Sequence, residues 1–252
     1  MKKIKNLESN LFYLFVIILC FFTALFLGNF FSNISKRASA VAHFGNKIIV
    51  IDAGHGGEDG GAVAHDGTLE KDINLKIAKK LNSLFLESGF NTTMVRTEDK
   101  AIYKDTGEKK TLRQKKVEDL KNRLHIANSN ENNIFVSIHQ NKFSDPNYSG
   151  TQIFYSGNKK ESEFLARCIK DILKKNLQPD NKRENKKAGR EIFLLNKINV
   201  PAVIVECGFL SNFEECEKLN KEEYQKEIAQ CIFEGIKNFL AEKIESKEQN
   251  AK

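Results

Sequence analysis

Beyond residue 44 the sequence alternates two kinds of segment, and this alternation limits the fold more than any other feature. Short apolar runs such as KIIVID (47–52) predict buried strands. Between them lie longer stretches whose apolar residues recur every three or four positions, as on one face of a helix. Strands that alternate with helices are typical of a mostly parallel sheet with helices on both faces. We therefore expect a single three-layer α/β domain with a mostly parallel sheet of about six strands.

The same pattern places the individual elements. The expected strands are 47–52, 91–96, 134–139, 151–156, 191–195 and 201–206. The expected helices lie at about 70–88, 112–128, 159–177 and 224–242. Polar composition predicts loops at about 97–110 and at 181–190.

The N-terminal segment does not belong to this domain. Residues 11–31 carry no charge and are long enough to cross a hydrocarbon core about 30 Å thick as a helix. The preceding Lys2, Lys3 and Lys5 indicate a cytoplasmic start, so the rest of the chain is expected to be exported. Small residues at 38–40 resemble a signal-peptidase site, but the apolar run exceeds an ordinary signal-peptide core, which favours an uncleaved anchor. We expect a membrane anchor or signal segment with linker at 1–43, the catalytic domain at 44–243 and a polar tail at 244–252.

Charge and cysteine content exclude some classes of partner. The net charge of the chain is +7, but five basic residues and one acid lie within residues 1–43, which leaves 35 basic against 32 acidic residues, or +3. This small excess gives no reason to expect a nucleic-acid partner. The five cysteines include no CxxC pair, and those beyond the apolar run are expected to be buried free thiols.

Three residues that are far apart in the sequence are expected to meet in such a sheet. His55 follows the first expected strand, Glu70 begins the first helix, and His139 ends the third strand. The carboxyl ends of neighbouring parallel strands converge on one crevice. Two imidazoles and a carboxylate leave a fourth position on zinc for water, which is the arrangement of catalytic sites. Because zinc lowers the pKa of water and polarises a carbonyl group, we expect a hydrolytic reaction.

Each of these residues also has a structural interpretation. A single histidine after a strand is more often a surface residue than a ligand, and a glutamate is favoured at a helix N-terminus. The glycine-rich segment GHGGEDGG around His55 would equally suggest phosphate binding, but it lacks the GxGxxG and GK[ST] patterns. Glu58 and Asp59 would also repel phosphate. The spacing alone therefore predicts a metal site of unspecified purpose.

Several blocks of the sequence resemble, in order, those of the zinc-dependent N-acetylmuramoyl-L-alanine amidases of the amidase 3 family. They are IVIDAGHGGEDGGAV, LEKDINL, DLKNRLHIANSN followed by IFVSIHQN, and PAVIVECGFLSN, over about residues 47–240. The resemblance implies that His55, Glu70 and His139 bind Zn²⁺ and that Glu206 is the catalytic carboxylate. Such a carboxylate takes a proton from water and hands one to the leaving amine.

The resemblance also implies a substrate and a place of action. The family cleaves the amide bond between N-acetylmuramic acid and L-alanine in peptidoglycan. The segments RQKKVEDLKNR and SGTQIFYSG are similar to those of the germination-specific, spore-cortex branch, which removes stem peptides during muramic-δ-lactam formation. The expected partners are peptidoglycan, the membrane through residues 11–31, and an unidentified accessory protein.

Asn141 is a further candidate for orienting a ligand or contacting glycan, and Arg123 is expected to fix its helix against its neighbours through hydrogen bonds.

Two other classes of protein are also compatible with these residues. A zinc peptidase or deacetylase of the cell envelope would use the same metal chemistry, but it would cut within the peptide or release acetate. A non-catalytic, membrane-tethered wall-binding protein would release nothing. The products of a digestion distinguish the three.

Overall fold

The computed structural model describes residues 2–44, 46–103 and 109–250, and its centre is a six-stranded sheet. The strand order is β2-β1-β3-β6-β4-β5, and every neighbouring pair is parallel except β4 and β6. This arrangement confirms the expected fold class. The strands are β1 (Ile48–Ala53), β2 (Asn91–Met94), β3 (Asn133–Asn141), β4 (Gln152–Tyr155), β5 (Lys186–Lys187) and β6 (Ala202–Phe209).

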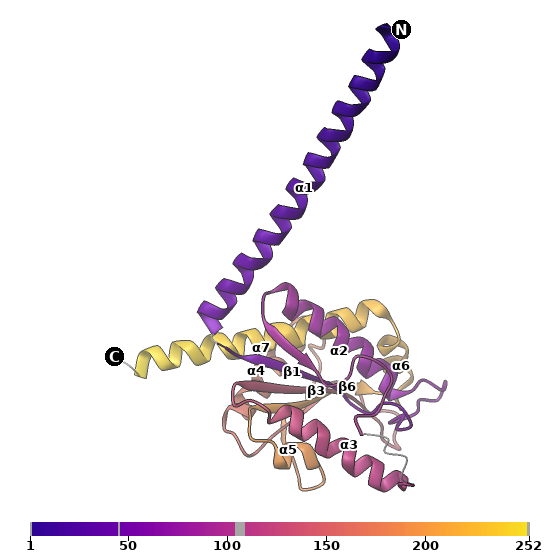
Figure 1. The fold of residues 1–252 in the computed structure, drawn as a ribbon. Helices are drawn as coiled ribbons and strands as arrows, with labels where there is room; N and C mark the ends of the chain where they lie inside the picture. The colour runs from indigo at the N-terminus through magenta and orange to yellow at the C-terminus, as the bar shows by residue number, and fades with distance from the viewer. Residues whose placement is uncertain (1, 45, 104–108, 251–252) are drawn as a thin grey trace.

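Helices cover both faces of the sheet and complete the three layers (Figure 1). One face packs against α2 (Glu70–Glu87), α4 (Glu161–Asn176) and α7 (Glu222–Asn250). The other face packs against α3 (Leu112–Ala127) and α5 (Phe193–Lys197), while α6 (Phe213–Leu219) follows β6. Successive strand residues point to opposite faces, so Ile49 and Ile51 enter the first core and Val50 enters the second.

Three local expectations were wrong. The segment 191–195 was expected to be a strand, but Phe193, Leu194 and Leu195 begin the short helix α5, in which Leu194 and Leu195 are buried. The stretch 181–190 was expected to be a loop, yet residues 186–187 form β5 at the edge of the sheet, a position where lysines are common. The last helix was expected to end at residue 242, but it continues to Asn250.

The N-terminal helix α1 (Lys2–Phe44) extends away from the sheet (Figure 1). Within the described residues, one segment is long and apolar enough to cross a membrane, namely the 21 residues Phe12–Ser32, which have a mean hydropathy of 2.5 and are not buried. A signal sequence would have the same properties. Part of the expected loop at 97–110, residues 104–108, lies outside the described residues.

The topology brings the ends of β1, β3 and β6 together. These three strands are parallel neighbours, with β3 in the middle, and Ala53 is in register with Ile138. His139 on β3 is in register with Glu206 on β6. Residues that follow β1 therefore lie beside residues near the ends of β3 and β6, as expected for a parallel sheet.

Candidate metal centre

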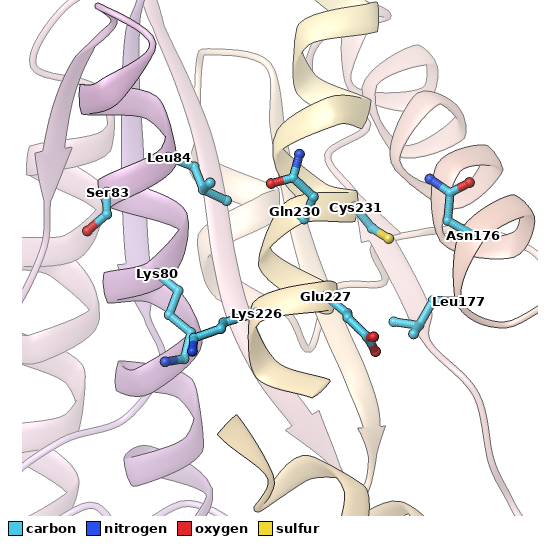
Figure 2. Close-up of a pocket in the computed structure, with 9 residues that line it drawn as sticks. All are labelled: Lys80, Ser83, Leu84, Asn176, Leu177, Lys226, Glu227, Gln230 and Cys231. Carbon is cyan, nitrogen blue, oxygen red and sulfur yellow. The ribbon is translucent and has the colours of Figure 1, made fainter. Parts of the chain in front are cut away.

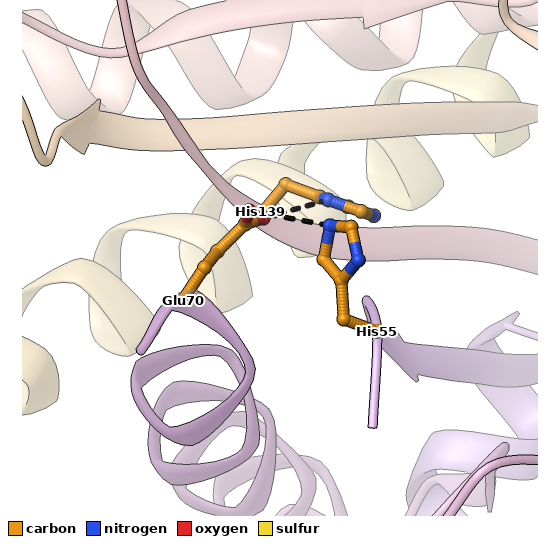
Figure 3. Close-up of side chains that lie close together, drawn as sticks. All are labelled: His55, Glu70 and His139. Atoms are coloured by element: carbon orange, nitrogen blue, oxygen red, sulfur yellow. Dashed lines mark hydrogen bonds and ion pairs between the residues drawn. The ribbon is translucent and has the colours of Figure 1, made fainter. Parts of the chain in front are cut away.

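His55, Glu70 and His139 come together at this edge of the sheet (Figure 3). His55 Nε2 lies 3.2 Å from Glu70 Oε2, and His139 Nδ1 lies 2.9 Å from Glu70 Oε1. The two imidazole rings are 5.0 Å apart between centroids and nearly perpendicular. One ligand atom from each residue lies within 4.8 Å of the other two. The carboxylate thus sits between two histidines, each of which presents one nitrogen to it.

The Glu70 carboxylate is buried and well supplied with donors. It begins α2, where acidic groups are favoured by the helix dipole. Its Oε2 accepts from the Ala62 backbone N–H at 2.8 Å, and its Oε1 accepts from the Gln140 N–H at 3.0 Å. Burial acts to raise the pKa of Glu70, but the hydrogen bonds with His139 and His55 outweigh it and hold that pKa far below its ordinary value. Glu70 is therefore ionised and available as a ligand.

His55 has an unusual backbone conformation, because its φ of 62° is the one left-handed value among the non-glycine residues that the structure describes. The carbonyl of His55 accepts from Arg123 Nη2 at 2.7 Å, which holds the turn in place. On the side chain, Nδ1 lies 3.0 Å from Asp59 Oδ2. Burial lowers the pKa of His55, but hydrogen bonds with Asp59 and Glu70 raise it to about 9 in the metal-free protein. Asp59 orients the ring so that Nε2 faces Glu70.

Two glycines make room for the ligands. A Cβ at Gly54 would overlap the His139 ring. At Gly61, where φ is 68°, a Cβ would lie 2.5 Å from Glu70 Oε2 and 2.8 Å from His55 Cδ2. Side chains at these positions would displace the ligands, so the glycine-rich loop serves close packing around the site.

Glu206 lies beside the trio but is not tied into it. Its Oε2 is buried and has no hydrogen-bond partner, which is rare for a buried carboxylate oxygen. Burial raises the pKa of Glu206 to about 7; the neighbouring Glu70 adds to this shift and His139 opposes it. An unpartnered acid with a pKa near neutrality can both accept and donate a proton.

The trio fits a bound metal ion. Two imidazole nitrogens and one carboxylate are the donor set of catalytic zinc centres, which leave one position open. Each histidine points a ring nitrogen at the same carboxylate. Packing alone does not explain why three such groups lie so close together. These side chains are suited to hold a divalent cation.

Two buried arginines secure the end of β1. Arg123 on α3 pairs with Asp52 at 2.5 Å and with Asp119 at 2.5 Å, which confirms the expectation that it fixes its helix through hydrogen bonds. Arg96 donates to the carbonyls of Ala53 (2.8 Å), Gly54 (3.0 Å) and Lys71 (2.8 Å). Arg96 therefore joins the strand end before His55 to the residue after Glu70. Its role was not foreseen, because an arginine at a strand end carries no local pattern.

Asn141 forms no hydrogen bond with the three candidate ligands among the described residues. Its side-chain oxygen accepts from the Lys142 N–H at 2.9 Å. Its proposed part in orienting a ligand stays a prediction. Asn74 and Gln140, which sequence reasoning missed, hydrogen-bond within this site instead.

Two hollows are relevant to the position of the site. A cavity of about 170 Å³ adjoins His55, and its lining includes Asp59, Tyr103, Leu112 and Lys116. A larger one of about 540 Å³ lies over α7 between α2 and the end of α4 (Figure 2). None of the four candidate site residues lines the larger hollow. Of these four residues only His55 lines the smaller one, so the position of the site follows from the metal-ligand group and not from a hollow.

Comparison with known proteins agrees with this geometry. A family model described as N-acetylmuramoyl-L-alanine amidase (Amidase_3) matches residues 49–238. The germination-specific N-acetylmuramoyl-L-alanine amidase of Bacillus subtilis is 36% identical over 239 residues, which cover 95% of this chain and 97% of that protein.

Solved structures are also similar. The CwlD amidase of Clostridioides difficile, solved in complex with the GerS lipoprotein, is 45% identical with a TM-score of 0.74, over 78% of this chain and 99% of that one. The amidase AmiC2 of Nostoc punctiforme is 28% identical with a TM-score of 0.63, over 78% of this chain and 98% of that one. The matched residues include all four site positions, and the chain belongs to the Amidase_3 family of N-acetylmuramoyl-L-alanine amidases.

Proposed function

We propose that this protein hydrolyses the amide bond between N-acetylmuramic acid and L-alanine in peptidoglycan, with Zn²⁺ held by His55, Glu70 and His139. One observation carries the proposal: a three-residue metal group meets Glu206, an acid whose buried Oε2 has no hydrogen-bond partner, at one edge of the sheet. Membership of the amidase family supports the choice of substrate bond.

The residues divide the reaction between them. When bound, zinc supplies a Lewis acid that polarises the amide carbonyl and makes water more acidic. Glu206 accepts a proton from the attacking water and donates one to the L-alanine nitrogen as the C–N bond breaks. The products are a lactyl carboxylate on the glycan and a stem peptide with a free amino group. The pKa of about 7 for Glu206 suits both proton transfers.

The place of action follows from the N-terminal segment. The helix within 12–32 either anchors the chain in the membrane or acts as a signal for export, so that the catalytic domain at 44–243 lies outside the cytoplasm. Similarity to the germination-specific enzyme supports a finer role, the removal of stem peptides during spore-cortex formation. The similar CwlD amidase was solved with a lipoprotein, which supports an accessory protein as a partner here.

The test is a digestion of purified peptidoglycan followed by mass spectrometry of the products. The wild-type protein with zinc should release stem peptides that begin with free L-alanine, and a chelator should stop the release. Glu206→Gln should retain zinc but lose activity by roughly 10³-fold or more, because it removes the group that moves the proton. A conservative control, Glu223→Gln on the exposed surface of α7, should remain active.

Other products would point to other functions. Cuts within the stem peptide would indicate a peptidase, and acetate release would indicate a deacetylase. Near-normal release of stem peptides by Glu206→Gln would remove that residue from the mechanism while leaving the amidase activity itself in place.

A further inference from the structure

One buried side chain contacts all three segments that carry the candidate ligands. Asn74 lies one turn after Glu70 in α2 and is fully buried. Its Nδ2 donates to Glu70 Oε1 at 3.2 Å and to the Gly54 carbonyl at 3.2 Å. Its Oδ1 accepts from Gln140 Nε2 at 3.1 Å. Gly54 and Gln140 are the direct sequence neighbours of the two candidate ligand histidines.

The chemistry of these partners determines which way the Asn74 amide points. A carboxylate and a carbonyl can only accept hydrogen bonds, so the NH₂ group of Asn74 must face Glu70 and Gly54. Its oxygen is then turned to Gln140, whose amide must present its own NH₂ group. Of the side chains with this shape, only an amide supplies both two donors and an acceptor: aspartate lacks the donors and leucine lacks both.

We propose that Asn74 is a positioning residue that sets the zinc affinity of the site by holding the three ligand segments together before the ion arrives. The inference rests on the proposed function in taking zinc as the ion. Asn74 reaches one ligand directly and the other two through adjacent residues, so it fixes their separation. If the three segments were mobile, zinc binding would have to order them, and the lost conformational freedom would lower the affinity. Because Asn74 already holds them in place, zinc binds more tightly.

The alternative is that Asn74 is an ordinary buried polar residue of α2 that contributes to folding and nothing more. The two cases differ in what a substitution does to metal binding. Loss of a folding contact lowers stability and leaves the affinity of the folded protein for zinc unchanged, whereas loss of a positioning contact lowers the affinity itself.

The experiment measures zinc affinity of the full-length protein in detergent by competition with a chelator. Asn74→Leu keeps the branching of the side chain but removes all three hydrogen bonds. It should weaken zinc binding by about 10- to 100-fold, as is usual for residues that orient metal ligands. The absorption spectrum of the cobalt(II)-loaded variant should also change, because the ligands surround the ion differently.

Two variants of the same helix serve as controls. Asn82→Leu makes the same substitution two turns further along α2, where the side chain accepts from Thr92 Oγ1 and lies away from the site. Ile77→Val removes one methylene from the core and destabilises α2 without touching the ligands. Both should bind zinc within about threefold of the wild type and should keep its cobalt spectrum.

The outcomes separate this proposal from the one on which it rests. If the wild-type protein binds no more zinc than His139→Ala, the metal assignment fails. If the wild type binds zinc and Asn74→Leu binds it equally well with an unchanged cobalt spectrum, the positioning role is wrong. If Asn74→Leu does not fold, Gln140→Leu decides, since it removes one of the three bonds without altering α2; an unchanged affinity there overturns the proposal and a loss supports it.

Discussion

At the scale of single residues, two neighbouring carboxylates have opposite surroundings. Glu70 is buried, but its hydrogen bonds with the His139 and His55 imidazoles hold its pKa low, whereas Glu206 has an oxygen with no partner and a pKa raised by burial to about 7. Environments that separate the pKa values of two acids in this way commonly assign them different tasks. Glu70 is suited to remain a charged ligand, and Glu206 is suited to exchange a proton.

The raised pKa of Glu206 predicts a pH-dependent stability of the metal-free protein. Below about pH 4.5 the group is protonated in both the folded and the unfolded chain, and between about pH 4.5 and 7 the folded chain binds more protons. The free energy of unfolding should therefore fall as the pH rises through this window. Glu206→Gln removes the effect and should be more stable than the wild type at pH 8, by up to about 3 kcal/mol, but not at pH 4.5.

Urea unfolding of the chelator-treated protein at the two pH values measures this difference. Glu223→Gln, at an exposed site, is the control: it retains Glu206 and should keep the pH dependence of the wild type. An equal effect of Glu206→Gln at pH 4.5 and pH 8 would contradict the raised pKa of Glu206 in the folded protein.

A single added methyl group should disturb the site at Gly54. Gly54→Ala places a Cβ within the His139 ring, so the ring must move, and zinc affinity should fall by at least about tenfold. Gly60→Ala in the same loop is the matched control, because its Cβ would lie 3.6 Å from Leu69, an ordinary contact. Chelator competition compares the two variants, and equal affinities would show that the space at Gly54 is not required.

At the scale of elements, α3 is joined to the site by charge as well as by packing. Arg123 on α3 is buried and bridges Asp52 at the end of β1 and Asp119 of its own helix. Asp119 in turn accepts from the Ile102 N–H at 2.6 Å, which ties the segment before α3 to the same cluster. The helix therefore positions the turn that carries His55, although it contributes no ligand.

Removal of this charge should cost much of the stability of the domain. Arg123→Met leaves Asp52 buried without its cation, and the loss of one partner of a buried ion pair typically costs about 3–5 kcal/mol. Arg113→Met, at an exposed position of the same helix, should change the free energy of unfolding by less than about 0.5 kcal/mol. Urea denaturation tests both. A cost below 1 kcal/mol for Arg123→Met would mean that α3 is held by its apolar contacts instead.

At the scale of the whole molecule, the two cores lie on the sheet, and the apolar segment 12–32 of α1 is exposed throughout. Neither core includes a residue of α1 among those described. Because the domain buries its own apolar residues without any contribution from α1, it does not need α1 to fold.

Deletion of residues 1–43 should accordingly leave a soluble, folded domain. Its zinc affinity should equal that of the full-length protein, and saturating zinc should raise its melting temperature, since a ligand that binds only the folded state stabilises it. Calorimetry with zinc and with chelator measures this shift. Aggregation of the shortened chain, or loss of its zinc binding, would show that α1 or the linker belongs to the domain.

Much of this protein is determined by local sequence. Periodicity alone predicts the order of strands and helices, because burial of one face imposes a repeat of 3.6 in helices and longer apolar runs in parallel strands. The rule that parallel strands end at one edge brings His55, His139 and Glu206 together before any coordinates are known. The family resemblance of the surrounding blocks then indicates the reaction.

Other features depend on contacts between distant segments, and local sequence does not reveal them. The apolar run at 191–195 suits a strand or a helix equally, and packing of Leu194 and Leu195 into the second core made it helical. The partners of Asn74 and Arg96 come from three separate parts of the chain, so no local pattern identifies them. Local sequence thus identifies the groups that can bind a metal. The contacts that hold those groups in place are visible only in the folded chain, because hydrogen bonds between distant segments form only on folding.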